Sequence, residues 1–197
     1  LNSAIYAALP PKTTKKESLS FITRIKASKT EAEILNIRKT MVIDGIAMVK
    51  FLKWLEGSIE KEQITEISAA LKLKAFRSEQ PDFHCESFAA ISAYESHGAV
   101  VHYNANKETN ATLRANGLFL IDSGGQYHGG TTDITRTLAL GPVSEQVRMD
   151  YTLVLKGHIG LATAVFPIGT RGVHLDILAR KALWNFGLNY GHGTGHG

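Results

Sequence analysis

Residues 118–138, LFLIDSGGQYHGGTTDITRTL, form the stretch that best predicts the fold of this chain. Two strand-like runs, 118–121 and 131–138, flank a loop that contains four glycines, and this arrangement predicts a β-hairpin. Residues at equal distances from the centre of a hairpin loop are cross-strand partners. A hairpin centred on this loop therefore places Asp122 opposite Asp133.

Two carboxylates on opposed strands need a neutralising partner. Directly opposed side chains have Cβ atoms about 4.5–5.5 Å apart, and like charges at that distance destabilise the pair. Either one carboxyl keeps its proton, with a raised pKa, or a cation lies between the two. Paired oxygen ligands suit divalent ions such as Mn²⁺ and Zn²⁺. The alternative is that Asp122 caps the turn while Asp133 is solvated at the start of a strand, and pairing alone leaves both interpretations open.

A second polar cluster, HGTGH, occupies residues 192–196. The glycines between the two histidines disfavour a helix, and they permit a close approach of the backbone to a ligand. The alternative is a flexible, histidine-rich terminus. A further candidate, His102, lies near the end of a strand-like run that begins at Ala99. A lone histidine in such a place is more often a structural residue than a ligand.

The sequence on either side of the hairpin predicts mostly helices. Thr30 and Glu33 have the spacing of a capping box, and apolar residues recur after them at the spacing of a long amphipathic helix. These residues are Ile34, Ile37, Met41, Val42, Val49, Leu52 and Leu55. Further helices are predicted at residues 61–76, 145–165 and 173–186. In the first of these, the residues expected to face the core are Ile64, Ile67, Leu71 and Leu73.

A short edge strand is predicted at residues 21–25. Helices followed by a hairpin and then by more helices favour an α+β fold over a doubly wound parallel sheet.

Composition and charge exclude several classes of protein. The 197 residues are 44% hydrophobic and 20% charged, unlike a disordered tail or a disulfide-rich miniprotein. No apolar run reaches the roughly 18–20 residues that span a bilayer, and the single Cys85 fits a reducing compartment. The net charge of +4 originates in the first 40 residues, where eight basic residues outnumber three acidic ones. Basic and aromatic residues do not interleave there, so we expect no nucleic-acid partner and no membrane.

Three segments, taken in order, resemble the Xaa-Pro aminopeptidases, which are metallopeptidases with the pita-bread fold. They are LIDSG at 120–124, GTTDITRT at 130–137 and HGTGHG at 192–197. Residues 87–102 and 154–159 are similar to the eukaryotic-type cytosolic branch of this family. The resemblance implies an α+β, pita-bread catalytic domain over residues 30–197, incomplete at its C-terminal end. Residues 1–29 are then a linker from an upstream domain, and we expect the chain to be a piece of a longer protein.

The resemblance also implies roles for individual residues. Asp122, Asp133 and His196 match metal ligands for two divalent ions, Mn²⁺ or Zn²⁺, with Asp133 bridging them. His102 and His192 match histidines that contact the substrate and stabilise the tetrahedral intermediate. No separate cofactor-binding residues are expected. The family's remaining two ligands are glutamates that come later than this sequence, so we expect it alone to bind metal weakly and to be inactive.

The implied activity is release of the N-terminal residue from peptides with proline in the second position. A hydroxide that bridges the two metal ions is the expected nucleophile. One alternative is a prolidase-type dipeptidase, and another is a non-catalytic pita-bread module that binds peptides or proteins. A cytoplasmic location is expected. Related enzymes are often dimers, so a homodimer is an assembly that the sequence leaves open.

Overall fold

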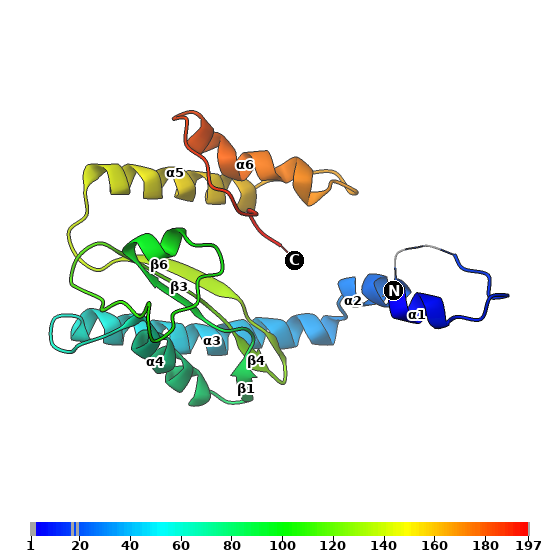
Figure 1. Cartoon of the computed structure of the whole chain (residues 1–197), viewed down its shortest axis with the longest axis horizontal. Coiled ribbons are helices and arrows are strands. Elements are labelled where there is room, and N and C mark those ends of the chain that lie inside the picture. The colour runs from blue at the N-terminus through cyan, green and yellow to red at the C-terminus, as the bar shows by residue number, and fades with distance from the viewer. Residues whose placement is uncertain (1–2, 17, 19, 197) are drawn as a thin grey trace.

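The computed structural model describes residues 3–16, 18 and 20–196 of the chain (Figure 1). Its elements, in order, are α1 (Ser3–Ala8), α2 (Phe21–Ala27), α3 (Glu31–Ser58), α4 (Glu66–Ser78), β1 (Phe83–Glu86), β2 (Ile91–Tyr94), the 3₁₀ helix η1 (Glu95–Ala99), β3 (Leu118–Ser123), β4 (Gly125–Tyr127), β5 (Gly130–Thr131), β6 (Ile134–Ala139), α5 (Glu145–Ala162) and α6 (Gly172–Trp184). The expected linker at 1–29 includes four residues outside the described ranges, namely 1, 2, 17 and 19, and the third motif ends outside them at residue 197. The division into 1–29 and 30–197 stays a prediction.

The strands form two antiparallel three-stranded sheets, in the orders β1-β4-β5 and β2-β3-β6. The predicted hairpin passes through both sheets, because β3 pairs with β6 in one and β4 pairs with β5 in the other. Tyr127 pairs with Gly130, so a two-residue turn closes the hairpin. The hairpin of the sequence prediction is therefore present, but it divides between two sheets.

The register of this hairpin differs from the predicted register by two residues. Asp122 lies opposite Thr135 and not opposite Asp133. The cause is the turn, which is centred between residues 128 and 129, one residue later than predicted. Because side chains alternate between the two faces of a strand, a shift of two residues leaves the two aspartates on the same face. They become diagonal neighbours instead of direct partners.

The chain crosses between the two sheets at Gly124, where a side chain would not fit. A Cβ atom added there would lie 1.9 Å from the carbonyl oxygen of Thr132. Ser87 fixes the crossing, because its backbone N–H donates to the carbonyl of Gly124 (3.0 Å) and its Oγ donates to the carbonyl of Thr132 (2.8 Å). This close approach places Asp133, the next residue, beside β3.

The helices α3 and α4 lie on one side of the β2-β3-β6 sheet, and the main core lies between them and the sheet (Figure 1). Its buried members are Met48, Phe51, Leu55, Ile64, Ala69, Leu73, Leu113, Phe119 and Ile121. The predicted capping box of Thr30 and Glu33 is confirmed at the start of α3. A second box, formed by Thr65 and Ser68, starts α4 at Glu66, five residues later than predicted.

Several apolar side chains of these helices do not face the core. Of the seven residues that mark the predicted stripe of α3, only Leu55 is buried, and Val42 is 66% exposed. In α4, Leu71 is 59% exposed although Leu73 is buried. The buried stripe of α3 instead runs through the polar Asp44. Apolar spacing therefore predicted the helix correctly but not the face that is buried.

The helices α5 and α6 pack against each other on the opposite side of the sheet from α3 (Figure 1). The closest approach is at Gly157, where an added Cβ atom would lie 2.0 Å from the carbonyl oxygen of Ala179. Each helix buries just two residues. Both helices were predicted, with ends that differ by at most three residues. Among the described residues, no helix combines the length and the apolar character that a membrane crossing requires.

Two predicted strands are not strands. Residues 21–25 lie in α2, which buries no side chain, and residues 99–103 lie in the end of η1 and the turn that follows it. A strand needs a neighbour for its backbone groups. Both segments instead satisfy these groups locally, as in the hydrogen bond from the N–H of Tyr103 to the carbonyl of Val100 (3.1 Å).

Candidate metal centre

Asp122, Asp133 and His196 come together on one face of the β3–β6 pair. The alternation of β3 buries Phe119 and Ile121 in the core and turns Asp122 to the opposite face. Asp133 directly precedes β6, and its Oδ2 lies 3.4 Å from Nε2 of His196. The histidine arrives from the segment that follows α6 and runs back towards the sheet (Figure 1).

The environment of Asp122 disfavours its charged form. Burial is the main cause that raises the pKa of the Asp122 carboxyl, and the nearby Asp133 raises it further. A hydrogen bond from Thr135 and the nearby imidazole of His196 act in the opposite direction. Repulsion between adjacent carboxylates is relieved when a proton or a cation joins them. The raised pKa of Asp122 therefore matches the interpretation in which a proton or a cation neutralises the two aspartates, and not the one in which Asp133 is simply solvated.

One atom of Asp122 indicates where such a cation would bind. Its Oδ1 is buried and has no hydrogen-bond partner in the described part of the chain. A buried oxygen without a donor is costly, and a divalent ion would satisfy it. Carboxylate and imidazole ligands suit Mn²⁺ and Zn²⁺, so these side chains fit the expected ions.

The arrangement is not a complete metal site as it stands. Within residues 3–16, 18 and 20–196, no three His, Cys, Asp or Glu side chains gather closely enough to hold an ion. His196 is 80% exposed, so its position depends on the segment that carries it and not on packing around the ring.

The structure places His192 in the same segment but with different contacts. Its ring stacks on that of Tyr190, with centroids 4.7 Å apart. Its Nδ1 lies 2.8 Å from the carbonyl oxygen of Gly193. Because a carbonyl can only accept, Nδ1 carries the proton, and Nε2 of the neutral ring is left as the acceptor. No contact joins His192 to the two aspartates in the described chain.

His102 is exposed and has no hydrogen bond or ion pair within the described residues. Its φ of 56° lies in the left-handed region, which is uncommon for a residue with a side chain and marks an externally constrained turn. The structure therefore does not bring His102 into contact with the two aspartates, and its expected role stays a prediction.

A buried glutamate, which the sequence analysis did not single out, fixes the loop that carries His102. The carboxylate of Glu66 is fully buried and accepts hydrogen bonds from the N–H of Tyr94 (2.7 Å), the N–H of Ala111 (3.0 Å) and the hydroxyl of Tyr103 (2.9 Å). Nδ1 of His97 lies 2.8 Å from it. The available signal was an acidic residue in the first helical turn, directly after the N-cap.

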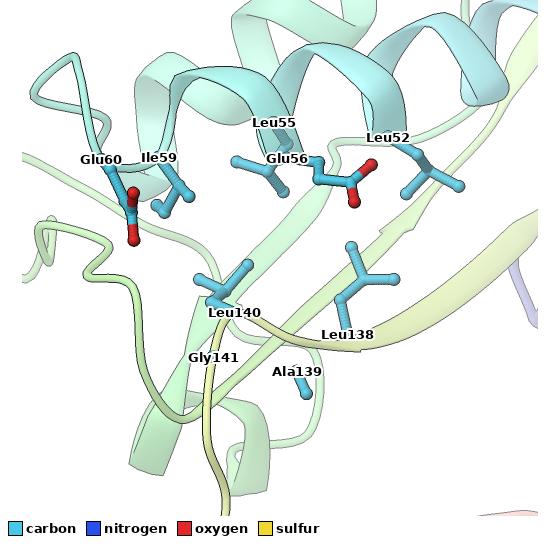
Figure 2. Close-up of a pocket in the computed structure, with 9 residues that line it drawn as sticks. All are labelled: Leu52, Leu55, Glu56, Ile59, Glu60, Leu138, Ala139, Leu140 and Gly141. Atoms are coloured by element: carbon cyan, nitrogen blue, oxygen red, sulfur yellow. The ribbon is translucent and has the colours of Figure 1, made fainter.

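Two of the surface hollows of the described chain differ in their position relative to the aspartates. Figure 2 shows a hollow of about 520 Å³ between the end of α3 and the end of β6, where Leu52 and Leu138 face each other. This end of β6 is remote from Asp133. The other hollow, of about 560 Å³, lies between the start of α6 and residues 193–196 and has His196 in its wall.

A pair of carboxylates and an imidazole on one face of a sheet is a donor set typical of metal-dependent enzymes. Comparison with known sequences is consistent with this assignment. The chain belongs to metallopeptidase family M24, whose sequence model matches residues 35–197. The expected resemblance and the α+β, pita-bread fold are thereby confirmed.

Curated relatives include a probable Xaa-Pro aminopeptidase P of Sordaria macrospora, which is 47% identical over 87% of this chain and 28% of its own length. The Drosophila melanogaster Xaa-Pro aminopeptidase ApepP is 43% identical over 98% of this chain and 32% of its own length. The chain thus spans about a third or less of these relatives.

Solved structures show the same similarity. The X-prolyl aminopeptidase of Caenorhabditis elegans, a cytosolic enzyme with a di-nuclear active site, superposes with a TM-score of 0.87 at 42% identity, over 90% of this chain and 29% of that one. The Xaa-Pro dipeptidase of Bacillus anthracis superposes with a TM-score of 0.78 at 25% identity, over 89% of this chain and 47% of that one.

Proposed function

We propose that this chain forms part of a metal-dependent aminopeptidase that releases the N-terminal residue from peptides with proline in the second position. The observation that carries the proposal is the meeting of Asp122, Asp133 and His196, which come from two segments distant in the sequence. The similarity to Xaa-Pro aminopeptidases supports the same activity. Two alternatives, a prolidase-type dipeptidase and a non-catalytic module that binds peptides or proteins, differ from this proposal in measurable ways.

In this proposal Asp122, Asp133 and His196 hold two divalent ions, Mn²⁺ or Zn²⁺. When bound, such ions lower the pKa of water and polarise a substrate carbonyl. The free Oδ1 of Asp122 supports its assignment as a ligand. The further ligands of a two-ion site would come from residues outside this sequence.

The two remaining histidines act on the substrate in this proposal. The hydrogen bond of Nδ1 to the carbonyl of Gly193 leaves Nε2 of His192 free to accept a hydrogen bond or a proton. His102 would reach the substrate from the loop that Glu66 fixes. An amide bond to proline has no N–H, so recognition of this bond has to rely on contacts to the carbonyl and to the ring.

The similarity to a cytosolic nematode enzyme supports a cytoplasmic location for this protein as well. We include a homodimer in the proposal because related enzymes are often dimers, and the sequence is compatible with that assembly. Size-exclusion chromatography with light scattering of the full-length protein would measure it.

The activity is tested on the full-length protein with an Xaa-Pro-Yaa peptide and a matched Xaa-Ala-Yaa peptide. We expect cleavage of the proline peptide alone, loss of cleavage with a chelator, and recovery with Mn²⁺ or Zn²⁺. Asp133→Asn should lower kcat/KM by more than the about 10–100-fold that loss of a hydrogen bond to a metal ligand typically costs. Asp150→Asn, a change on α5 away from the site, is the control and should leave cleavage unchanged.

The alternatives give different results in the same assay. Cleavage restricted to an Xaa-Pro dipeptide would replace the aminopeptidase by a dipeptidase. Metal binding without cleavage of either substrate would indicate a non-catalytic module. Cleavage that persists in the presence of chelator would contradict the metal-dependent mechanism.

A further inference from the structure

We propose that Asp176 and Arg180, an ion pair on α6, are positioning residues that hold the histidine-bearing segment 189–196 in place above the two aspartates. The inference deepens the proposed function, on which it rests for the assignment of His196 as a metal ligand. Neither residue was singled out from the sequence, and neither touches the aspartates or the rings of His192 and His196.

The guanidinium of Arg180 makes contacts along most of the segment. Its Nε donates to Oδ2 of Asp176 at 2.7 Å. One terminal nitrogen donates to Oδ1 of Asn189 (3.0 Å) and to the carbonyl of Tyr190 (2.6 Å). The other donates to the carbonyl of His192 at 2.7 Å. A guanidinium offers five N–H donors in a fixed plane, and here one side chain uses that plane to bind three residues of the segment, Asn189, Tyr190 and His192.

Asp176 extends the anchored region towards His196. While its Oδ2 accepts from Arg180, its Oδ1 accepts from the hydroxyl of Thr194 at 2.8 Å. The ring of Tyr190 also lies 4.8 Å from the guanidinium carbon. The anchors at Asn189, Tyr190, His192 and Thr194 thus follow the segment up to two residues before His196.

The segment needs such anchors because little else orders it. Residues 188–196 form neither helix nor strand, and every second residue from 191 to 195 is glycine. Glycine loses the most backbone freedom on ordering. His196 itself is 80% exposed. If the segment were free, binding of a metal ion would have to order it, and the affinity would fall accordingly.

The ion pair is sheltered enough to perform this role. The side chain of Arg180 is 13% exposed and that of Asp176 is 34% exposed. A pair that only stabilised its own helix would face solvent, as does Arg148 beside Glu145 on α5, where the side chains are 69% and 93% exposed. Each pair joins two residues of one helix, but the two side chains of the α6 pair also hydrogen-bond to residues of the segment.

The test uses the full-length protein and compares Arg180→Lys with Arg148→Lys. Lysine keeps the charge but cannot donate to several fixed acceptors at once. We expect Arg180→Lys to weaken Mn²⁺ binding, measured by calorimetry, by about 10–100-fold. Amide hydrogen exchange in residues 189–196 should accelerate while exchange in α3 stays unchanged. Arg148→Lys should alter neither measurement.

Thr194 provides a second pair of variants that avoids any change of charge. Thr194→Val removes the hydroxyl that donates to Asp176, and Thr194→Ser retains it. We expect weaker Mn²⁺ binding and a lower kcat in the valine variant, with both restored in the serine variant. A structural role of the methyl group alone would give the reverse order.

The outcomes separate this inference from the proposed function. If the parent protein cleaves the proline peptide while Arg180→Lys and Thr194→Val bind Mn²⁺ within twofold of the parent, the positioning role is overturned and the function stands. If the parent binds Mn²⁺ without cleavage while both variants bind it more weakly, the positioning role stands and the peptidase activity does not.

Discussion

The aspartates and the histidine of the candidate metal centre lie in two regions that are stabilised differently. In the first region, formed by α3, α4 and the two sheets, Arg77 on α4 contacts Asp44 on α3 at 2.7 Å and both are almost fully buried. In the second, formed by α5, α6 and residues 189–196, the main ion pair stays partly exposed. Each helix of the second region buries just two residues.

The difference indicates separate tasks for the two regions. The first region fixes the aspartates on a sheet whose core includes polar groups that are paired with one another. Burial and the contact with Asp44 raise the pKa of Tyr127, so its hydroxyl remains a donor to that carboxylate. The second region presents imidazoles from a segment that water reaches. A divalent ion held by both would join regions that otherwise share few contacts.

The largest effect is expected from a test of whether the first region owes its stability to buried ion pairs. Arg77 and Lys50 both connect α3 with α4, one through the buried pair with Asp44 and the other through an exposed pair with Glu79. Arg77→Met should lower the free energy of unfolding by about 3–5 kcal/mol, because Asp44 is left as an uncompensated buried charge. Lys50→Met should cost no more than about 1 kcal/mol. Urea unfolding of the full-length protein measures both, and equal losses would contradict the comparison.

A smaller effect is expected at the contact between α5 and α6. Gly157→Ala should destabilise the pair by about 1–3 kcal/mol, because the new Cβ meets the carbonyl of Ala179 and forces the helices apart. Gly160→Ala, one turn away, is the matched control. Its Cβ would lie 3.6 Å from the carbonyl of Leu178, an ordinary contact, so the gain in helix propensity of up to about 1 kcal/mol should dominate. Thermal unfolding and amide exchange in α6 distinguish the two.

The smallest expected effect is that of low pH on the segment held by Asp176. Hydrogen bonds from Arg180 and from Thr194 lower the pKa of the Asp176 carboxyl from its ordinary value of 3.8. A lowered pKa means that the charged form stabilises the fold above the ordinary pKa, and that this contribution is lost as the pH falls through the lowered value. Amide exchange in residues 189–194, corrected for intrinsic rates, should therefore accelerate as the pH falls below the ordinary pKa of 3.8 and approaches the lowered pKa of Asp176.

The control for this pH dependence is Asp176→Asn, which keeps an acceptor for Thr194 but cannot titrate. At pH values above the ordinary pKa of Asp176, amide exchange in residues 189–194 should be faster in this variant than in the parent. The exchange rate of the variant should also vary less with pH. An unchanged pH dependence in the variant would assign the effect to another group.

The sequence predicted features that depend on neighbouring residues. The capping box of Thr30 and Glu33 was predictable because both partners lie within one helical turn, and the hydrogen bonds between them are present. The prediction that both aspartates lie on one face of the hairpin was correct. Side chains alternate between the two faces of a strand, so an error of two residues in the register does not move either aspartate to the other face. Their direct pairing was wrong because the register depends on where the turn closes, and the turn closes one residue later than predicted.

Features that depend on distant partners were missed. Arg77 meets Asp44 across 33 positions, and nothing near either residue marks the contact. Asp176 and Arg180 have the spacing of an ordinary helical ion pair, but their contacts to residues 189–194 follow from the path of the segment. The strand predicted at residues 21–25 failed for the same reason, since a strand is defined by a neighbour that local composition does not specify.

The last anchored side chain before His196 is that of Thr194, and this limits how far the imidazole can travel. Two residues of fully extended chain span at most about 7 Å. Whatever conformation Gly195 adopts, the backbone of His196 therefore stays close to Asp176 in the first half of α6. If His196 is a metal ligand, as proposed, an ion bound by the two aspartates would meet this imidazole at a high local concentration, and few backbone bonds would have to be ordered when it binds.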